Sequence, residues 1–230
     1  MLATSPCGAL LTSLQAVIIG KEPVLRLVVG ALLAGGHALL EDVPGVGKTL
    51  LARTLARAVG GDWKRVQFSP DLLPSDITGV NVFQPATGEF RFVPGPVFAH
   101  VLLADEINRA SPRTQSSLLE AMEEGRVTVD GQTHDLPAPF MVIATQNPVE
   151  HHGTFPLPEA QLDRFAIAVS LGYPAPDEEA QLLARAIGPD PGQAEGPVVG
   201  PGQLAAWQAE VREVRVDPSL QAYIVAVANA

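Results

Sequence analysis

The chain has 230 residues and a mass of 24.2 kDa, which suits one large domain or one domain with a small appendage. Its 15 basic and 25 acidic residues give a net charge of −10, which argues against a broad surface for nucleic acid or for anionic membranes. The single cysteine, Cys7, excludes an internal disulfide and favours a reducing compartment.

The segment of residues 24–40 is the one candidate for a membrane span. It contains Arg26, a Gly35-Gly36 break and His37, so we interpret it as a buried helix followed by a buried strand. The first residues lack the basic start and small-residue cleavage site of a signal peptide. We therefore expect a cytoplasmic protein with no membrane span.

The region before residue 35 is predicted to be helical. Residues 3–17 are weakly amphipathic, and a short apolar run at residues 17–20 follows and ends in a turn glycine. Pro23 suits the first turn of a helix, because its missing N–H would be unpaired there anyway. A helix is predicted over residues 23–34, and since it is apolar nearly all round we expect it to be buried.

A glycine-rich loop with a lysine and a threonine follows the strand predicted at residues 37–40. The segment DVPGVGKT, residues 42–49, precedes a helical pattern, and this order is typical of a phosphate-binding P-loop, G-x-x-x-x-G-K-[ST]. Asp42 stands where the first glycine belongs. Taken alone, the segment has the alternative interpretation of a chance glycine-rich turn.

Four residues of this loop carry its chemistry. Gly45 and Gly47 can adopt positive φ and let successive N–H groups face an anion at a helix N-terminus. Lys48 would reach the β- and γ-phosphates, and Thr49 would offer its hydroxyl to Mg²⁺.

Short apolar runs alternate with helical patterns over the next hundred residues. The predicted strands are residues 63–68, 101–104, 140–144 and 165–169, and the predicted helices are 51–59, 111–125 and 159–164. Residues 71–79 are turn-rich. Two hairpins are predicted, one over residues 80–93 that turns near Thr87-Gly88 and one over residues 126–136 that turns at Asp130-Gly131.

This alternation predicts an α/β fold with a parallel sheet covered on both faces. In such sheets the ligand lies at the carboxyl ends of the strands. Glu41-Asp42, Asp105-Glu106 and Thr145 to Asn147 each follow a predicted strand directly. We therefore expect these three segments to lie together.

The polar residues at these strand ends suit hydrolysis of a nucleoside triphosphate. Asp105 suits Mg²⁺, and Glu106 suits the base that deprotonates the attacking water. The alternative is that the two carboxylates only cap the next helix. Asn147 could hold the attacking water or the γ-phosphate, or could simply form a turn before Pro148.

Two further polar features point to no chemistry by themselves. Arg164 lies between a short helix and a strand, where an arginine is usually a solvated surface charge. His151 and His152 are adjacent in a loop and have no cysteine or third histidine at ligand spacing, so no metal site is expected there.

The C-terminal part has a different sequence pattern, with helices and no predicted strand. Residues 177–187, 203–214 and 218–228 are predicted helices, and residues 188–202 form a linker rich in Pro and Gly. This pattern indicates the start of a small helical subdomain.

With these residues in place, the chain resembles the MoxR family of AAA+ ATPases. The resemblance rests on LLEDVPGVGKTLLARTLA (39–56), LLPSDITG (72–79), VPGPVFAHVLLADEINRASPRTQSSLLEAMEEG (93–125) and ATQNPVEHHGTFPLPEAQLDRF (144–165). The motifs follow the family's order and cover most of residues 15–172, and their joint occurrence is highly specific. Asp42 looks like a variation that the family accepts.

The resemblance implies a fold and a division into domains. Residues 1–172 would form a P-loop AAA+ core, with a five-stranded parallel sheet flanked by helices and a β-hairpin insertion at about residues 80–93. Residues 173–230 would begin a C-terminal helical lid. The sequence stops before the sensor 2 arginine, in a motif like GASPRA, so we expect an incomplete lid, through truncation or because the sequence is a fragment.

The resemblance also implies roles for single residues. Asp105 and Glu106 correspond to Walker B and Asn147 to sensor 1. Arg164 corresponds to an arginine finger that reaches the γ-phosphate on a neighbouring subunit. The adenine pocket is expected to involve Val17, Ile18 and Gly20. The other expected nucleotide contacts are Val43, Pro44, Gly45, Val46, Gly47, Lys48, Thr49, Leu50 and Asp105, with Thr49 and Asp105 as the Mg²⁺ ligands.

The function implied is a Mg²⁺-dependent ATPase that forms a homo-oligomeric ring, a hexamer, and remodels or matures partner proteins, including proteins with von Willebrand factor A domains. The hairpin at residues 80–93 would engage clients. Two alternatives stay open. One is a DNA-dependent AAA+ motor, because helicase relatives share such hairpins, although the acidic balance argues against it. The other is a nucleotide-switched scaffold that does not hydrolyse ATP, which the incomplete lid suggests.

Overall fold

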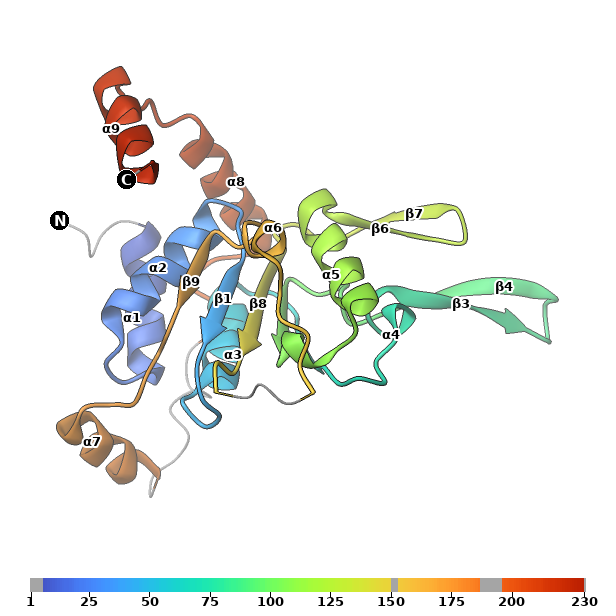
Figure 1. Cartoon of the computed structure of the whole chain (residues 1–230), viewed down its shortest axis with the longest axis horizontal. Coiled ribbons are helices and arrows are strands. Elements are labelled where there is room, and N and C mark those ends of the chain that lie inside the picture. The colour runs from blue at the N-terminus through green and yellow to red at the C-terminus, as the bar shows by residue number, and fades with distance from the viewer. Residues whose placement is uncertain (1–5, 150–152, 187–195, 230) are drawn as a thin grey trace.

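The computed structural model describes residues 6–149, 153–186 and 196–229 (Figure 1). His151, His152 and part of the linker predicted at residues 188–202 lie outside these ranges. Within them, no helix is both long enough and apolar enough to cross a membrane. Residues 24–40 are divided between a helix and a strand, as their composition predicts.

A parallel sheet of five strands forms the centre of the described chain (Figure 1). Its strands are β1 (Ala38–Glu41), β2 (Trp63–Gln67), β5 (Val101–Asp105), β8 (Met141–Gln146) and β9 (Ile167–Val169). They lie in the order β2-β5-β8-β1-β9, and each neighbouring pair is parallel. The predicted five-stranded parallel sheet is confirmed, and each predicted strand end lies within two residues of the observed one.

The central strands are apolar on both sides because helices cover both faces of the sheet. Successive side chains of a strand point to opposite faces. Leu103 of β5 and Ile143 of β8 accordingly belong to one buried cluster, and Leu102 and Val142 belong to another.

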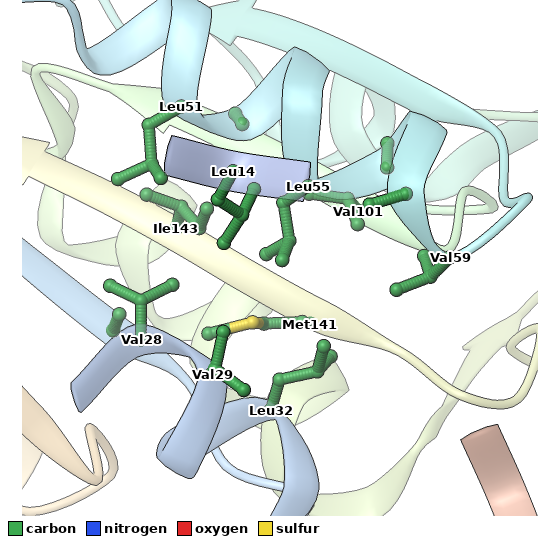
Figure 2. Close-up of a cluster of buried hydrophobic side chains, with 14 of the residues drawn as sticks. Leu14, Val28, Val29, Leu32, Leu51, Leu55, Val59, Val101, Met141 and Ile143 are labelled. Atoms are coloured by element: carbon green, nitrogen blue, oxygen red, sulfur yellow. The ribbon is translucent and has the colours of Figure 1, made fainter. Parts of the chain in front are cut away.

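The first cluster joins three helices to the sheet. These helices are α1 (Pro6–Val17), α2 (Glu22–Leu33) and α3 (Lys48–Ala58). Figure 2 shows Leu14 of α1, Leu32 of α2 and Leu55 of α3 gathered around Met141 and Ile143 of β8. Because these side chains are buried, the α3 helix that follows the P-loop is held firmly against the sheet.

The prediction that the second helix is buried nearly all round is wrong in part. α2 buries Leu25, Val28 and Leu32 against the first cluster, whereas Arg26 and Leu27 are exposed. Arg26 forms an ion pair with Glu22 one turn earlier, at 2.5 Å. One face of α2 is therefore in contact with water despite its apolar sequence.

The second cluster includes residues of three helical segments: α4 (Pro74–Thr78), the 3-10 helix η1 (Ile107–Arg109) and α5 (Pro112–Glu124). α5 begins and ends where the sequence predicts. The Ser111 hydroxyl accepts a hydrogen bond from Thr114 N at 3.3 Å, and Gly125 closes the helix with φ of 65°. The short helix α4 lies within the segment predicted to be only turn-rich.

Two hairpins extend side by side from the same end of the molecule (Figure 1). Their strands are β3 (Gly79–Gln84) with β4 (Glu89–Pro94), and β6 (Arg126–Val129) with β7 (Gln132–Asp135). Asn81 Nδ2 donates to Asp130 Oδ2 at 2.8 Å, and the rings of Phe92 and His134 stack at 3.9 Å. Both predicted hairpins form, and they support each other.

After residue 153, the described parts of the chain contain the helices α6 (Glu159–Leu162), α7 (Pro176–Ala186), α8 (Pro201–Arg212) and α9 (Pro218–Ala228). α8 packs on the core, since Leu204 is fully buried and Gln208 Nε2 donates to the Leu32 carbonyl at 2.7 Å. In α7, Arg185 Nη1 donates to the Ala16 carbonyl at 2.9 Å. The division of the chain at residues 172 and 173 stays a prediction.

Candidate functional site

A cavity of about 420 Å³ lies where β1, β5 and β8 end. The predicted site residues in its wall are Pro44, Gly45, Gly47, Lys48, Thr49, Leu50, Asp105, Glu106 and Asn147. They come from three segments far apart along the chain, and the structure brings them together at the carboxyl edge of the sheet. Arg65 and Gln67 of β2 complete the wall.

The loop before α3 has the conformation that its glycines permit. Gly45 and Gly47 have φ of 91° and 98°, and Gly47 caps the N-terminus of α3. A side chain at either position would have space, so the positive φ is what requires glycine there. The Lys48 side chain is buried, and its Nζ donates to the Asp42 carbonyl at 2.9 Å. A positive charge and a helix N-terminus therefore border the same cavity.

Thr145 fixes the two carboxylates at the end of β5. Its hydroxyl donates to Asp105 Oδ1 at 2.6 Å and accepts from the Glu106 main-chain N–H at 2.9 Å. Because Thr145 is fully buried on β8, the neighbouring strand holds Asp105 and Glu106 in place. Glu106 also has a left-handed backbone, with φ of 57°, which turns the chain sharply after the strand.

Polar side chains bind one oxygen of each carboxylate, Oδ2 of Asp105 and Oε2 of Glu106. Arg65 donates to Asp105 Oδ2, through Nη2 at 2.6 Å and Nε at 3.2 Å. Gln67 Nε2 donates to Glu106 Oε2 at 2.8 Å, and Arg109 Nε lies 3.0 Å from the same oxygen. The alternative that Asp105 and Glu106 only cap the next helix does not account for these contacts around the cavity.

Asn147 forms the turn that its sequence position suggested, and it also borders the cavity. It is buried at the end of β8, and its Oδ1 accepts from the Val149 N–H at 3.1 Å, which forms the turn around Pro148. It also lines the cavity. The turn bond leaves the amide nitrogen as the group that a ligand could use.

Arg164 is not in the wall of this cavity. Its Nη2 forms an ion pair with Glu123 Oε2 of α5 at 2.9 Å, and its side chain is partly exposed. Arg164 therefore points to α5 and not into the cavity of its own chain.

A second cavity, of about 530 Å³, adjoins the first one and shares Gly45, Gly47 and Leu50 with it. Its wall is mostly apolar and includes Val17, Ile18 and Val46, which are among the predicted nucleotide contacts. The wall also includes residues 171–174 and the α7 residues Leu182 and Leu183. Gly20 and Val43, also predicted contacts, line neither of these two cavities.

Sequence reasoning missed Arg65 and Gln67. The one available signal is their spacing, because residues two apart on a strand share a face. That β2 lies beside β5 is visible only in the structure, where Gln67 is in register with Asp105. Neither propensity nor a motif indicates this pairing.

The oxygen donors around the first cavity fit Mg²⁺ bound together with phosphate. Mg²⁺ prefers oxygen ligands and usually keeps only one or two from the protein when phosphates supply others. The Thr49 hydroxyl and the Asp105 carboxylate both border the cavity. Among the residues that the structure describes, no group of three His, Cys, Asp or Glu side chains could hold a metal by itself.

The comparisons with known proteins agree with this geometry. Residues 37–167 match the model of the "ATPase family associated with various cellular activities (AAA)". An uncharacterised protein of Bacillus subtilis, YeaC, is 52% identical over 96% of this chain and 69% of its own length. The chaperone MoxR1 of Mycobacterium tuberculosis is 46% identical over 93% of this chain, which spans 56% of that relative.

The solved structures give the same result. A crystal structure from Cytophaga hutchinsonii, described as that of a candidate ATPase, matches with a TM-score of 0.85 and 39% identity, over 94% of this chain and 66% of the other. The protein MoxR of Paracoccus denitrificans is 36% identical over 75% of this chain and 52% of its own length. The fold, the P-loop and the relatives agree, and the chain belongs to the MoxR family of AAA+ ATPases.

Proposed function

We propose that this chain binds ATP with Mg²⁺ in the first cavity and hydrolyses it to ADP and phosphate. One observation carries the proposal: Lys48, Asp105, Glu106 and Asn147 reach a single cavity from three separate strand ends. Phosphoryl transfer needs little covalent chemistry from a protein, because catalysis consists mainly of positioning and electrostatic stabilisation. A set of one buried cation, two carboxylates and one amide suits that task.

Each residue has a proposed role that follows from its contacts. The α3 N-terminus and Lys48 neutralise the phosphates, and Thr49 and Asp105 hold Mg²⁺, which when bound would neutralise charge on the β- and γ-phosphates. Glu106 accepts a proton from the attacking water. Asn147 orients that water or the γ-phosphate through its amide nitrogen.

The contacts of Glu106 suit a base that must hold its position. Gln67 and Arg109 both bind its Oε2, and Thr145 binds its main-chain N–H. Since both of these side-chain contacts within the described residues are to Oε2, we assign the other carboxylate oxygen, Oε1, to the attacking water. Arg65 pairs with Asp105 Oδ2, so a cation at Asp105 would have to share this carboxylate with Arg65 or displace it.

We also propose that Arg164 acts on a neighbouring subunit. The arginine is partly exposed and away from the cavity of its own chain, which suits a finger that completes another copy's site. A finger supplied in this way can be worth about 10³ to 10⁵ in rate. Activity would therefore depend on assembly into a ring, for which we propose a hexamer.

The wider role that we propose is remodelling or maturation of partner proteins in the cytoplasm. A relative named as a chaperone at 46% identity supports it, as do the projecting hairpins, where Phe83 and Phe90 are exposed. Partners with a von Willebrand factor A domain are part of this proposal.

Replacement of Glu106 by Gln tests the hydrolytic role. The amide keeps the size of the side chain but cannot accept a proton, so we expect ATP affinity near that of the wild type and turnover lower by about 10² or more. Binding is measured with a fluorescent ATP analogue and hydrolysis by phosphate release. Glu120→Gln, an exposed position on α5, makes the same charge change away from the cavity and is the control.

Two other results would change the proposal. Unchanged turnover in Glu106→Gln removes Glu106 as the base. A wild-type chain that binds ATP but shows no single-turnover hydrolysis, at protein concentrations where copies associate, favours the scaffold that switches with nucleotide and does not hydrolyse it.

A further inference from the structure

Asp42 connects the P-loop to the segment that follows the last strand of the sheet. The residue is only 4% exposed. Its carboxylate accepts three hydrogen bonds, from Ser170 Oγ at 2.7 Å, Leu171 N at 2.6 Å and Gly172 N at 2.9 Å. Residues 170–172 lie between β9 and α7, where the sheet ends and the C-terminal helices begin.

The main chain of Asp42 meets the P-loop lysine. The Asp42 carbonyl accepts from Lys48 Nζ at 2.9 Å, and the Asp42 N–H donates to the Gln146 carbonyl of β8 at 3.1 Å. A P-loop lysine reaches bound phosphates. A phosphate in the cavity would therefore draw the Lys48 ammonium from the Asp42 carbonyl, so that occupation of the P-loop changes the contacts of Asp42.

The segment that Asp42 holds is also a wall of the second cavity. Leu171, Gly172 and Tyr173 line that cavity, which adjoins the phosphate end. Gly172 has φ of 61°, so the chain turns sharply just after the bonded amides. Lys21 Nζ then donates to the Tyr173 carbonyl at 2.6 Å, which joins this wall to the segment after α1.

A carboxylate at this position needs a reason, because a negative charge in a phosphate-binding loop repels phosphate. The three donors from residues 170–172 stabilise the charge, as hydrogen bonds to a buried carboxylate do. If Asp42 served only the loop, donors from the loop itself would be sufficient. Two of the three donors, Leu171 N and Gly172 N, instead belong to residues in the wall of the other cavity, and Ser170 immediately precedes them.

We propose that Asp42 is a positioning residue that sets the base-binding wall of the site and couples it to the phosphate end. The inference rests on the proposed nucleotide binding. The carboxylate holds residues 170–172 at a fixed place beside the P-loop, and phosphate binding at Lys48 is transmitted through Asp42 to the start of the C-terminal helices. Binding of the purine base therefore depends on Asp42 more than binding of the phosphates does.

Binding of ADP and of pyrophosphate to Asp42→Asn tests this dependence. An amide offers one acceptor oxygen to three donors, so residues 170–172 lose part of their support. We expect ADP affinity to fall by about tenfold or more. Pyrophosphate affinity is expected to fall by no more than about twofold, because the substitution also removes a charge that repels phosphate. Glu41→Gln is the matched control, because it makes the same charge change on the adjacent, exposed residue.

Amide hydrogen exchange supplies a second readout at the segment itself. We expect ADP to slow exchange at Leu171 and Gly172 in the wild type, and we expect these amides to exchange faster and to respond little to ADP in Asp42→Asn. If Asp42→Asn does not fold, Ser170→Ala removes one of the three bonds and is expected to weaken ADP in the same direction by a smaller factor.

Three results decide against the inference. Equal losses of ADP and pyrophosphate affinity would confine Asp42 to the P-loop. Behaviour of Asp42→Asn like that of Glu41→Gln, or of Ser170→Ala like the wild type, would remove the positioning role. A wild-type chain that binds neither ligand would instead overturn the proposed function, and this inference with it.

Discussion

The central sheet buries its apolar residues, whereas the last helix of the described chain leaves its apolar residues exposed. Every residue of β5 is buried, from Val101 to Asp105. α9 is comparably apolar, PSLQAYIVAVA, yet it buries none of its residues. Its ribbon lies away from the sheet (Figure 1). Apolar sequence alone therefore does not show what is buried, because burial also requires a covering element.

The difference matters for the site because the two cavities belong to different parts of the molecule. The first is built from strand ends and α3, which the two buried clusters hold rigidly. The second takes part of its wall from residues 171–174 and from α7, whose side chains are mostly exposed. The first cavity is thus anchored in the core, whereas the second depends on a few hydrogen bonds such as those of Asp42.

The largest loss of stability is expected from a substitution that leaves an empty space in the packed core of the sheet. Leu103 of β5 is fully buried in the first cluster, so Leu103→Ala removes apolar contacts that its neighbours cannot replace. We expect the free energy of unfolding to fall by about 2 to 5 kcal/mol. Urea unfolding followed by circular dichroism measures it. A loss below about 1 kcal/mol would mean that the sheet is packed more loosely than the structure shows.

An intermediate effect is expected from His37, which joins three core elements just before β1. Its Nδ1 accepts from the Val142 N–H at 3.0 Å, so Nε2 carries the proton and donates to the Met122 carbonyl at 3.1 Å. The Phe140 ring lies edge-on at 5.7 Å. Burial lowers the pKa of His37 below 6.5, and the Met122 bond opposes this only in part.

The sign of the pH effect follows from that shift. The unfolded chain takes up the proton at a higher pH than the folded chain, so the stability from neutral His37 is present above pH 6.5 and is lost as the pH falls through the folded-state pKa. We expect the free energy of unfolding to decrease from pH 7.5 to 5.5. Asp217 does not interfere, because hydrogen bonds from Ser219 lower its pKa below 3.8.

The substitution His37→Gln distinguishes the contribution of His37 to the pH dependence of stability from that of the other titratable groups. At pH 7.5 the variant loses well-placed buried hydrogen bonds, which costs about 1 to 3 kcal/mol. Between pH 7.5 and 5.5 its stability should change less than that of the wild type. Equal slopes for the two proteins would show that His37 does not titrate with folding in this range.

The sequence predicts the site well where the signal is local and poorly where it depends on packing. Gly45, Gly47 and Lys48 follow a buried strand, and Asp105 and Glu106 end another, so the parallel sheet places them at one edge. The contacts of Arg65 with Asp105 and of Asp42 with residues 170–172 depend on which strands are neighbours. The exposed face of α2 was missed for a similar reason, since what covers a helix lies elsewhere in the chain.

The smallest change in stability is expected from a leucine-to-alanine substitution on α9. Leu220 is 54% exposed, so Leu220→Ala removes area that is already largely in contact with water, and alanine is the better helix former. We expect the free energy of unfolding to change by no more than about 0.5 kcal/mol, against several for Leu103→Ala. A larger loss would mean that the face is covered in solution. If a second copy covers it, the loss grows with protein concentration, because association stabilises the folded state by mass action.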